Sequence, residues 1–182
     1  MLVNTKSENM NEKVILVDEN DNEIGIEEKI KAHENGGKLH RAISVVVFNS
    51  KGEMMIQKRA QTKYHCPGKW ANTCCSHPRP GEPTEKAAAR RLMEEMGFSC
   101  KLEEKFSIIY RVTFENGLTE YEFDHIFIGK FDGEPKPNPE EVEEWKFINI
   151  NELSKDIHVN WKNYAPWFLI LYEKLKEHRI IT

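Results

Sequence analysis

Apolar residues in this chain fall into short runs of the β type, separated by polar turns. Residues 42–48 have the sequence Ala-Ile-Ser-Val-Val-Val-Phe, a β-branched and nearly continuous run that predicts a buried central strand. A turn at residues 49–52 precedes residues 54–58, which we expect to pair back as a hairpin. Residues 108–114 and 120–128 are also strand-like, and Asn116-Gly117 between them is a strong hairpin signal.

The remaining elements follow from shorter patterns. Strands are expected at residues 14–17 and 145–148, and helices at residues 27–33, 84–96, 151–157 and 161–178. Thr84 is the expected N-cap of the second helix, and Gly97 is its expected end. Strands, a helix, more strands and a final helix predict an α+β fold, a mixed β-sheet sandwich with flanking helices.

Residues 59–83 show no regular pattern and are rich in Pro, Gly, His and Cys. A long irregular stretch inside a compact domain is more often functional than not. Three of the four cysteines lie here, and in a reducing compartment such a group is more often catalytic, metal-bound or buried than disulfide-bonded. Adjacent Cys74 and Cys75 are a poor disulfide pair, because neighbouring side chains of an extended chain point apart.

The composition narrows the class of protein. A chain of 182 residues favours one domain, here residues 13–182, preceded by a polar and flexible segment at residues 1–12. A net charge of −4 argues against non-specific nucleic-acid binding. The sequence has no apolar run of the roughly 20 residues that a membrane helix needs, and its start lacks a secretory apolar core. We therefore expect a cytoplasmic protein without membrane or nucleic-acid partners.

Charges on the predicted helix at residues 84–96 are spaced for ion pairs, Arg90 with Glu94 and Arg91 with Glu95. Spacing alone favours a solvated helix face with pairs of about 0.3–0.5 kcal/mol each. The context resembles the Nudix box, which seven positions match in register: Glu82, Arg90, Leu92, Glu94, Glu95, Gly97 and Phe98. In that family the loop–helix–loop places carboxylates around Mg²⁺, which holds a diphosphate.

Two positions depart from the box. Ser76 stands where the box has Gly, and Arg91 stands where it has the first Glu of the helix pair. A lost carboxylate weakens a metal cluster that activates water, and Arg91 adds a charge that binds diphosphate. The box therefore argues for diphosphate binding and against ordinary hydrolysis.

The chain as a whole closely resembles the type 1 isopentenyl-diphosphate isomerases, a branch of the Nudix superfamily. The resemblance spans residues 29–167, and its most specific part is Cys75-Ser76-His77-Pro78 followed by the degenerate box. Cys66 and Cys74 depart from the common pattern of the family at positions to which we assign no chemistry. The other matching segments are Lys29 with Ala32-His33, Leu39-His40, Lys58-Arg59-Ala60 with Lys63, residues 67–72, Tyr110-Arg111, Glu120-Tyr121-Glu122 and Pro166-Trp167.

A mixed nitrogen and oxygen metal site is the second motif. A lone histidine is more often a surface or core residue than a ligand, and two like charges on a strand face are mildly destabilising. Glu120 and Glu122 share one face of their strand, and together with three histidines they suit Mn²⁺, Zn²⁺ or Mg²⁺. The resemblance implies that one metal is bound by His33, His40, His77, Glu120 and Glu122. It also implies that Glu95 helps hold a second ion, Mg²⁺, which arrives with the substrate diphosphate.

The resemblance further implies a clamp for two phosphates, formed by Lys29, Arg59, Lys63 and Arg91. Scattered cations are usually only surface residues. Moving a double bond along three carbons needs a strong acid, a base and exclusion of water, since the intermediate is a tertiary carbocation. Cys75 and Glu122 are the candidate pair.

Two aromatic residues complete this prediction. Tyr110 is expected to hydrogen-bond near the catalytic pair. Trp167 is expected to place its π face against the cation, a contact of about 2 kcal/mol when desolvated, although ordinary helix packing also explains it.

Two alternatives remain. A Nudix hydrolase would release phosphate from its diphosphate substrate, whereas an isomerase of isoprenoid biosynthesis would not. A structural zinc module built on Cys66, Cys74, Cys75 and His77 lacks the usual Cys-x₂-Cys pair. The favoured partner is a small isoprenoid diphosphate, and a monomer is favoured.

Overall fold

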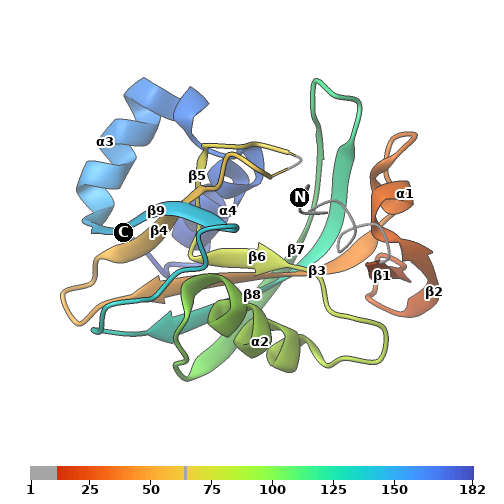
Figure 1. Cartoon of the computed structure of the whole chain (residues 1–182), viewed down its shortest axis with the longest axis horizontal. Coiled ribbons are helices and arrows are strands. Elements are labelled where there is room, and N and C mark those ends of the chain that lie inside the picture. Colours follow the sequence, from red (N-terminus) through yellow and green to blue (C-terminus); the bar gives the residue numbers. More distant parts are fainter. Residues whose placement is uncertain (1–11, 64) are drawn as a thin grey trace, which may run out of the picture.

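A computed structural model of the chain describes residues 12–63 and 65–182. Within this part the strands join into one nine-stranded sheet, with α-helices on both of its faces (Figure 1). The strands are β1 Lys13–Val17, β2 Glu23–Glu28, β3 His40–Phe48, β4 Met54–Arg59, β5 Trp70–Ala71, β6 Cys74–Ser76, β7 Leu102–Thr113, β8 Thr119–Lys130 and β9 Val142–Ile148. The helices are α1 Lys29–His33, α2 Thr84–Met96, α3 Ile150–Asn160, the 3₁₀ helix Trp161–Asn163 and α4 Pro166–Glu177.

The sheet is mixed, and β3 is its centre. β3 runs parallel to β8 along its whole length, from His40 opposite Glu122 to Phe48 opposite Lys130. β7 pairs with β8 in an antiparallel hairpin. On its other side β3 pairs with β4 only at residues 47–48 and with β6 at residues 43–45, while β4 continues beside β9. This arrangement brings β6 and the first residues of β8 to either side of β3.

Apolar side chains pack against both faces of the sheet. Val45 and Phe127 lie in a cluster with residues of α2, whereas Val46 and Ile126 lie in a second cluster with residues of α4. Successive residues of a strand point to opposite faces, so alternate positions of β3 and β8 supply the two clusters. The continuous apolar run at residues 42–48 is explained by this burial on both faces, and the predicted α+β fold is confirmed.

Several predicted boundaries were wrong. The strands predicted at residues 108–114 and 145–148 begin earlier, at Leu102 and Val142. The helix predicted at residues 27–33 is only α1, because Glu27 and Glu28 belong to β2, an edge strand whose Ile24 and Ile26 are exposed and therefore gave no burial signal. Pro83, not Thr84, is the N-cap of α2, and no side chain caps it. The C-terminal helix restarts at Pro166, because proline disfavours a helical conformation in the residue before it.

The hairpins and the end of α2 agree with prediction. Gly97 ends α2 in the left-handed conformation, with φ of 70°. In the part of the chain that the structure describes, no helix is long and apolar enough to cross a membrane. Of the segment predicted to be flexible, residues 1–11 lie outside the described residues, and Glu12 forms an ion pair with Lys29 at 2.7 Å.

Candidate active site

One pocket gathers the predicted catalytic and substrate-binding residues from many separate elements. Every residue predicted for catalysis or for the phosphate clamp lines it, and so does Trp167 of α4. The lining residues are Lys29, Arg59, Lys63, His65, Cys75, Ser76, His77, Arg91, Tyr110, Glu120, Glu122 and Trp167. Side chains that are far apart in the sequence therefore share one concave site.

The predicted metal ligands form one compact group beside this pocket. Their ligand atoms all lie within 4.8 Å of one another, and the group comprises His33, His40, His77, Glu120 and Glu122. The parallel register of β3 and β8 places His40 opposite Glu122. Glu120 and Glu122 face the same side of β8, as predicted.

Two of the imidazole rings are fixed by backbone carbonyls. Nδ1 of His33 lies 2.6 Å from the carbonyl of Lys29, and Nδ1 of His40 lies 2.7 Å from the carbonyl of Lys38. A carbonyl only accepts, so each Nδ1 carries the proton of this hydrogen bond and each Nε2 is directed toward the cluster. Carbonyl partners of this kind orient the histidine ligands of metal sites.

The Nε2 atoms of the histidines and the carboxylate oxygens converge in a small volume. Nε2 of His40 is 3.1 Å from Nε2 of His77, and Nε2 of His33 is 2.9 Å from Oε2 of Glu120. Five atoms with lone pairs in so small a volume repel one another unless a proton or a cation lies among them. These nitrogen and carboxylate oxygen atoms therefore suit a divalent metal ion, and several metals accept such a set of ligands.

Ionisation of the group matches that role. Burial and the charge of Glu122 raise the pKa of Glu120, but hydrogen bonds from His33 and His65 outweigh them and bring it to about 2. Burial likewise opposes ionisation of Glu122, yet its bonds to the histidines lower its pKa overall. Burial and neighbouring cations hold the pKa of His77 well below its usual value. Anionic carboxylates and a neutral imidazole are the forms that bind metal.

His33 behaves differently from His77. Burial lowers its pKa, but the hydrogen bond to Glu120 and the charge of that carboxylate raise it overall. A proton on His33 therefore competes with a metal ion for the same position.

Cys75 faces the pocket, whereas its neighbour Cys74 is buried against α2. Two buried side chains fix the backbone just before the two cysteines. Asn72 donates to the carbonyls of Val45 and Cys74, and Thr73 donates to the carbonyl of Met55. Burial raises the pKa of the Cys75 thiol, so the group carries its proton at neutral pH.

Tyr110 and Glu122 form a buried pair across the β7–β8 hairpin. The Tyr110 hydroxyl donates to Oε2 of Glu122, while Oε1 of Glu122 lies 2.8 Å from Nε2 of His77. Burial and the charge of Glu122 hold the pKa of Tyr110 well above its usual value, so the hydroxyl stays protonated. Glu122 therefore belongs both to the candidate metal cluster and to the lining of the pocket.

The four cations of the predicted clamp lie at one pocket and are held by carboxylates or by the backbone. Arg91 contacts Glu95 at 2.6 Å and Glu141 at 3.5 Å, and Lys63 also pairs with Glu141. Since the side chain of Glu95 is only 5% exposed, the interpretation of the Arg91–Glu95 pair as a solvated helix face is wrong.

Glu95 contacts Arg91 and does not belong to the five-residue cluster. Its Oε2 accepts a hydrogen bond from Gln57 at 3.0 Å, and its Oε1 accepts one from Arg91. A role for Glu95 toward a second Mg²⁺ stays a prediction.

Two residues that contact the candidate site residues were not predicted from the sequence: His65, which lines the pocket, and Glu141, which does not. Nε2 of His65 lies 3.1 Å from Oε1 of Glu120, and Glu141 holds both Lys63 and Arg91. A histidine between Lys63 and Pro67, in a stretch already predicted to be functional, was the available signal for His65. Glu141 lies in an acidic run that resembles an ordinary solvated surface, so it gave no signal.

The structural zinc module is contradicted. All four cysteines are free, Cys74 and Cys75 pack in different clusters, and His77 contacts Glu122 and His40 instead of cysteines.

Comparisons with known proteins show the family to which the chain belongs. The NUDIX domain family model matches residues 38–168. "Isopentenyl-diphosphate Delta-isomerase 1" of Aromatoleum aromaticum is 52% identical over 158 residues, covering 87% of this chain and 89% of that protein. "Isopentenyl-diphosphate Delta-isomerase" of Pectobacterium atrosepticum is 43% identical over 166 residues, covering 91% and 92%.

A solved structure gives the same fold at much lower identity. A protein of Deinococcus radiodurans superposes with a TM-score of 0.74 over 91% of this chain and 98% of that chain, at 19% identity. At that identity the likeness shows the fold alone.

Proposed function

We propose that this chain, which belongs to the isopentenyl-diphosphate Delta-isomerase family of Nudix-domain proteins, interconverts isopentenyl and dimethylallyl diphosphate. The observation that carries the proposal is the placement of Cys75 and the Tyr110–Glu122 pair in the same pocket as four cations. The names of the relatives indicate the substrate, and the pocket contains a candidate acid, a candidate base and a candidate phosphate clamp.

The reaction adds one proton to a terminal methylene carbon and removes another from the allylic carbon. Protonation produces a tertiary carbocation, and loss of the second proton places the double bond at its new position. Water would trap the cation, so the acid and base must act inside a closed pocket. Glu122 is buried and Cys75 is half-buried, so both groups lie away from open solvent, as this requirement demands.

Cys75 and Glu122 differ in their protonation states. The thiol carries a proton and the carboxylate does not, so the pair contains one donor and one acceptor. The reverse reaction exchanges the two roles. Tyr110 donates to Glu122 and holds that carboxylate in one orientation.

A divalent metal is proposed at the cluster of His33, His40, His77, Glu120 and Glu122, with Mn²⁺, Mg²⁺ or Zn²⁺ as candidates. When bound, the ion supplies positive charge that favours the anionic form of Glu122. A second ion, Mg²⁺, is proposed to enter with the diphosphate and to be held with the help of Glu95.

The clamp is proposed to exchange its carboxylate partners for phosphate oxygens. Lys63 and Arg91 both contact Glu141, and Lys29 contacts Glu12, so each cation is already positioned and desolvated before the substrate arrives. An arginine binds phosphate through two parallel hydrogen bonds. Trp167 is buried at the same pocket, and its ring is the proposed partner of the carbocation.

Hydrolysis is disfavoured by Arg91. This guanidinium occupies the helix position at which the Nudix box carries its first carboxylate, and it neutralises Glu95. We further propose that the protein acts in the cytoplasm as a monomer and that its partner is the isoprenoid diphosphate.

The test is incubation of the purified protein with isopentenyl diphosphate and Mg²⁺ in D₂O, followed by NMR. We expect dimethylallyl diphosphate with deuterium in a methyl group and no release of inorganic phosphate. Phosphate release without a shifted double bond would contradict the proposal and support the hydrolase. Unchanged substrate with metal-replete protein would refute both.

A further inference from the structure

His65 lies in the loop between β4 and β5 and reaches the candidate metal cluster from outside. Its Nε2 is 3.1 Å from Oε1 of Glu120, and Nε2 of His33 is 2.9 Å from the other oxygen, Oε2. The two histidines therefore hold one carboxylate between them. Only His33 belongs to the group of five whose ligand atoms converge.

The backbone of His65 contacts the other half of the site. Nε and one terminal nitrogen of Arg59 donate to the carbonyl of His65 at 3.3 and 3.2 Å. The same guanidinium lies 5.0 Å from the centre of the Trp167 ring. A single loop residue thus touches a candidate metal ligand and a candidate phosphate-binding side chain.

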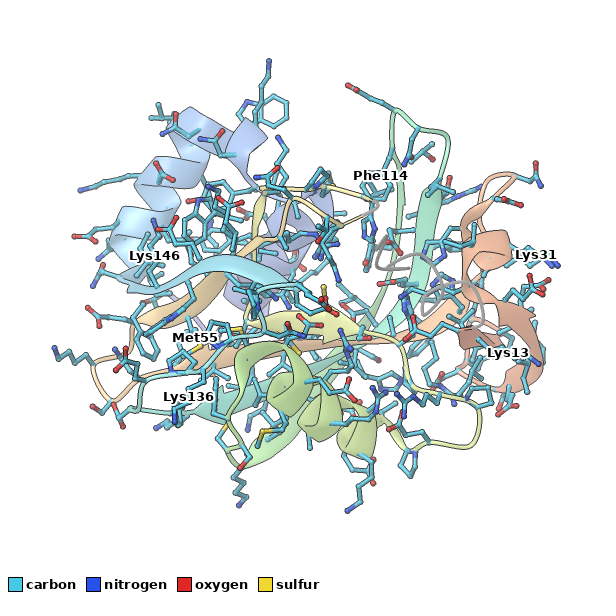
Figure 2. All side chains as sticks on the ribbon, in the orientation of Figure 1. Lys13, Lys31, Met55, Phe114, Lys136 and Lys146 are labelled. Carbon is cyan, nitrogen blue, oxygen red and sulfur yellow. The ribbon has the colours of Figure 1, made fainter. Side chains whose placement is uncertain are left out.

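The imidazole ring is also enclosed by aromatic residues of two other elements. Its centroid is 5.3 Å from Trp167 and 5.4 Å from Phe114, which Figure 2 places near the tip of the β7–β8 hairpin. Only 11% of the His65 side chain is exposed. Packing therefore restricts the orientation of the ring that contacts Glu120.

We propose that His65 is a positioning residue, whose Nε2–H donates to Oε1 of Glu120 and so directs Oε2 toward the metal. The inference rests on the proposed function, because it assigns the metal cluster a role in the same site. Outer-shell hydrogen bonds fix the orientation of metal ligands, and their loss typically weakens metal binding about 10–100-fold. Here the donor comes from the substrate-pocket loop, so the loop and the metal ligand are ordered together.

The test separates the hydrogen bond from ring packing. His65→Phe keeps a ring between Trp167 and Phe114 but has no donor, whereas His65→Gln keeps an N–H donor and loses the ring. The affinity of each purified variant for Mn²⁺ is measured by titration, with His158→Gln, a change in an exposed residue of α3, as the matched control. We expect His65→Phe to bind Mn²⁺ about 10-fold more weakly and His65→Gln to recover most of the loss.

Activity adds a second readout. Isomerisation by His65→Phe should be low at limiting Mn²⁺ and return toward the wild-type rate when Mn²⁺ is in excess. Wild-type affinity in His65→Phe, or equal weakening in His65→Phe and His65→Gln, would overturn the proposal.

The wild-type protein itself supplies an independent check. Imidazole ¹⁵N spectra of the Zn²⁺-loaded protein should show a proton on Nε2 of His65, and an unprotonated Nε2 would overturn the assignment even if the variants fail to fold. Absence of isomerisation by the wild type would refute the proposed function, whereas the metal affinities would still test His65.

Discussion

Cys74 and Cys75 are neighbours in β6, but their side chains have opposite environments. Cys74 is completely buried in the cluster beneath α2, and Cys75 lines the pocket with Tyr110 and Glu122. The alternation of a strand thus separates a packing thiol from a candidate catalytic one. This pair allows two similar substitutions to be compared at adjacent positions.

Cys75→Ala is expected to lower kcat for isomerisation by at least about 10²–10⁴-fold, the usual contribution of a positioned proton-transfer group. Metal and diphosphate binding should be retained, because no candidate metal ligand changes. Cys74→Ala is the matched control. It should lose about 1 kcal/mol of unfolding free energy, as typical core substitutions do, and keep its activity. Normal turnover by Cys75→Ala would remove this residue from the mechanism.

The metal cluster has its own test. His77→Ala and Glu120→Ala should each lower the amount of bound divalent metal, measured by elemental analysis of purified protein, because each removes one of five converging candidate ligands. Removal of metal by a chelator should abolish isomerisation and leave the circular dichroism spectrum unchanged, since two large apolar clusters hold the sheet together. Unchanged stoichiometry in either variant would contradict the assigned ligands.

A third prediction concerns Arg91. Arg91→Gln should raise KM for the diphosphate by about 10-fold or more, because a charge-assisted phosphate contact is lost. It should also lower the unfolding free energy by roughly 3 kcal/mol, since Glu95 would stay buried without its cation. Arg79→Gln is the control, because the side chain of Arg79 is 61% exposed. Wild-type KM and stability in Arg91→Gln would show that the clamp does not include it.

Much of the fold followed from local patterns, whereas the site depended on long-range contacts. The apolar run of β3 and the Asn116-Gly117 turn are local signals, and both gave correct strands. β2 was missed because Ile24 and Ile26 stay exposed, so the strand depends on backbone pairing with β1.

The candidate site was found mainly through motifs. The approach of His77 and Glu122 to His40 depends on β3 pairing with both β6 and β8, and His33 reaches them from α1. Spacing in the sequence does not encode these contacts. Glu141 was not predicted because the two cations that it contacts, Lys63 and Arg91, are 78 and 50 residues away in the sequence. Its contacts exist only in the folded chain.

The last prediction concerns the ion pair between Glu82, in the loop before α2, and Arg90 of that helix. Both oxygens of Glu82 accept hydrogen bonds from Arg90 at 2.7 Å, and these bonds lower the pKa of Glu82 although burial opposes them. A depressed pKa in the folded state stabilises the protein above the unfolded pKa of about 4.3, and this contribution is lost as the pH falls through the folded value. Glu82→Gln should therefore be less stable than wild type at pH 7, with the difference shrinking below about pH 4. Urea unfolding at a series of pH values measures it, with Glu115→Gln in the exposed β7–β8 turn as control. A difference that is constant with pH would show that the hydrogen-bonded shape of Glu82, and not its charge, stabilises this loop.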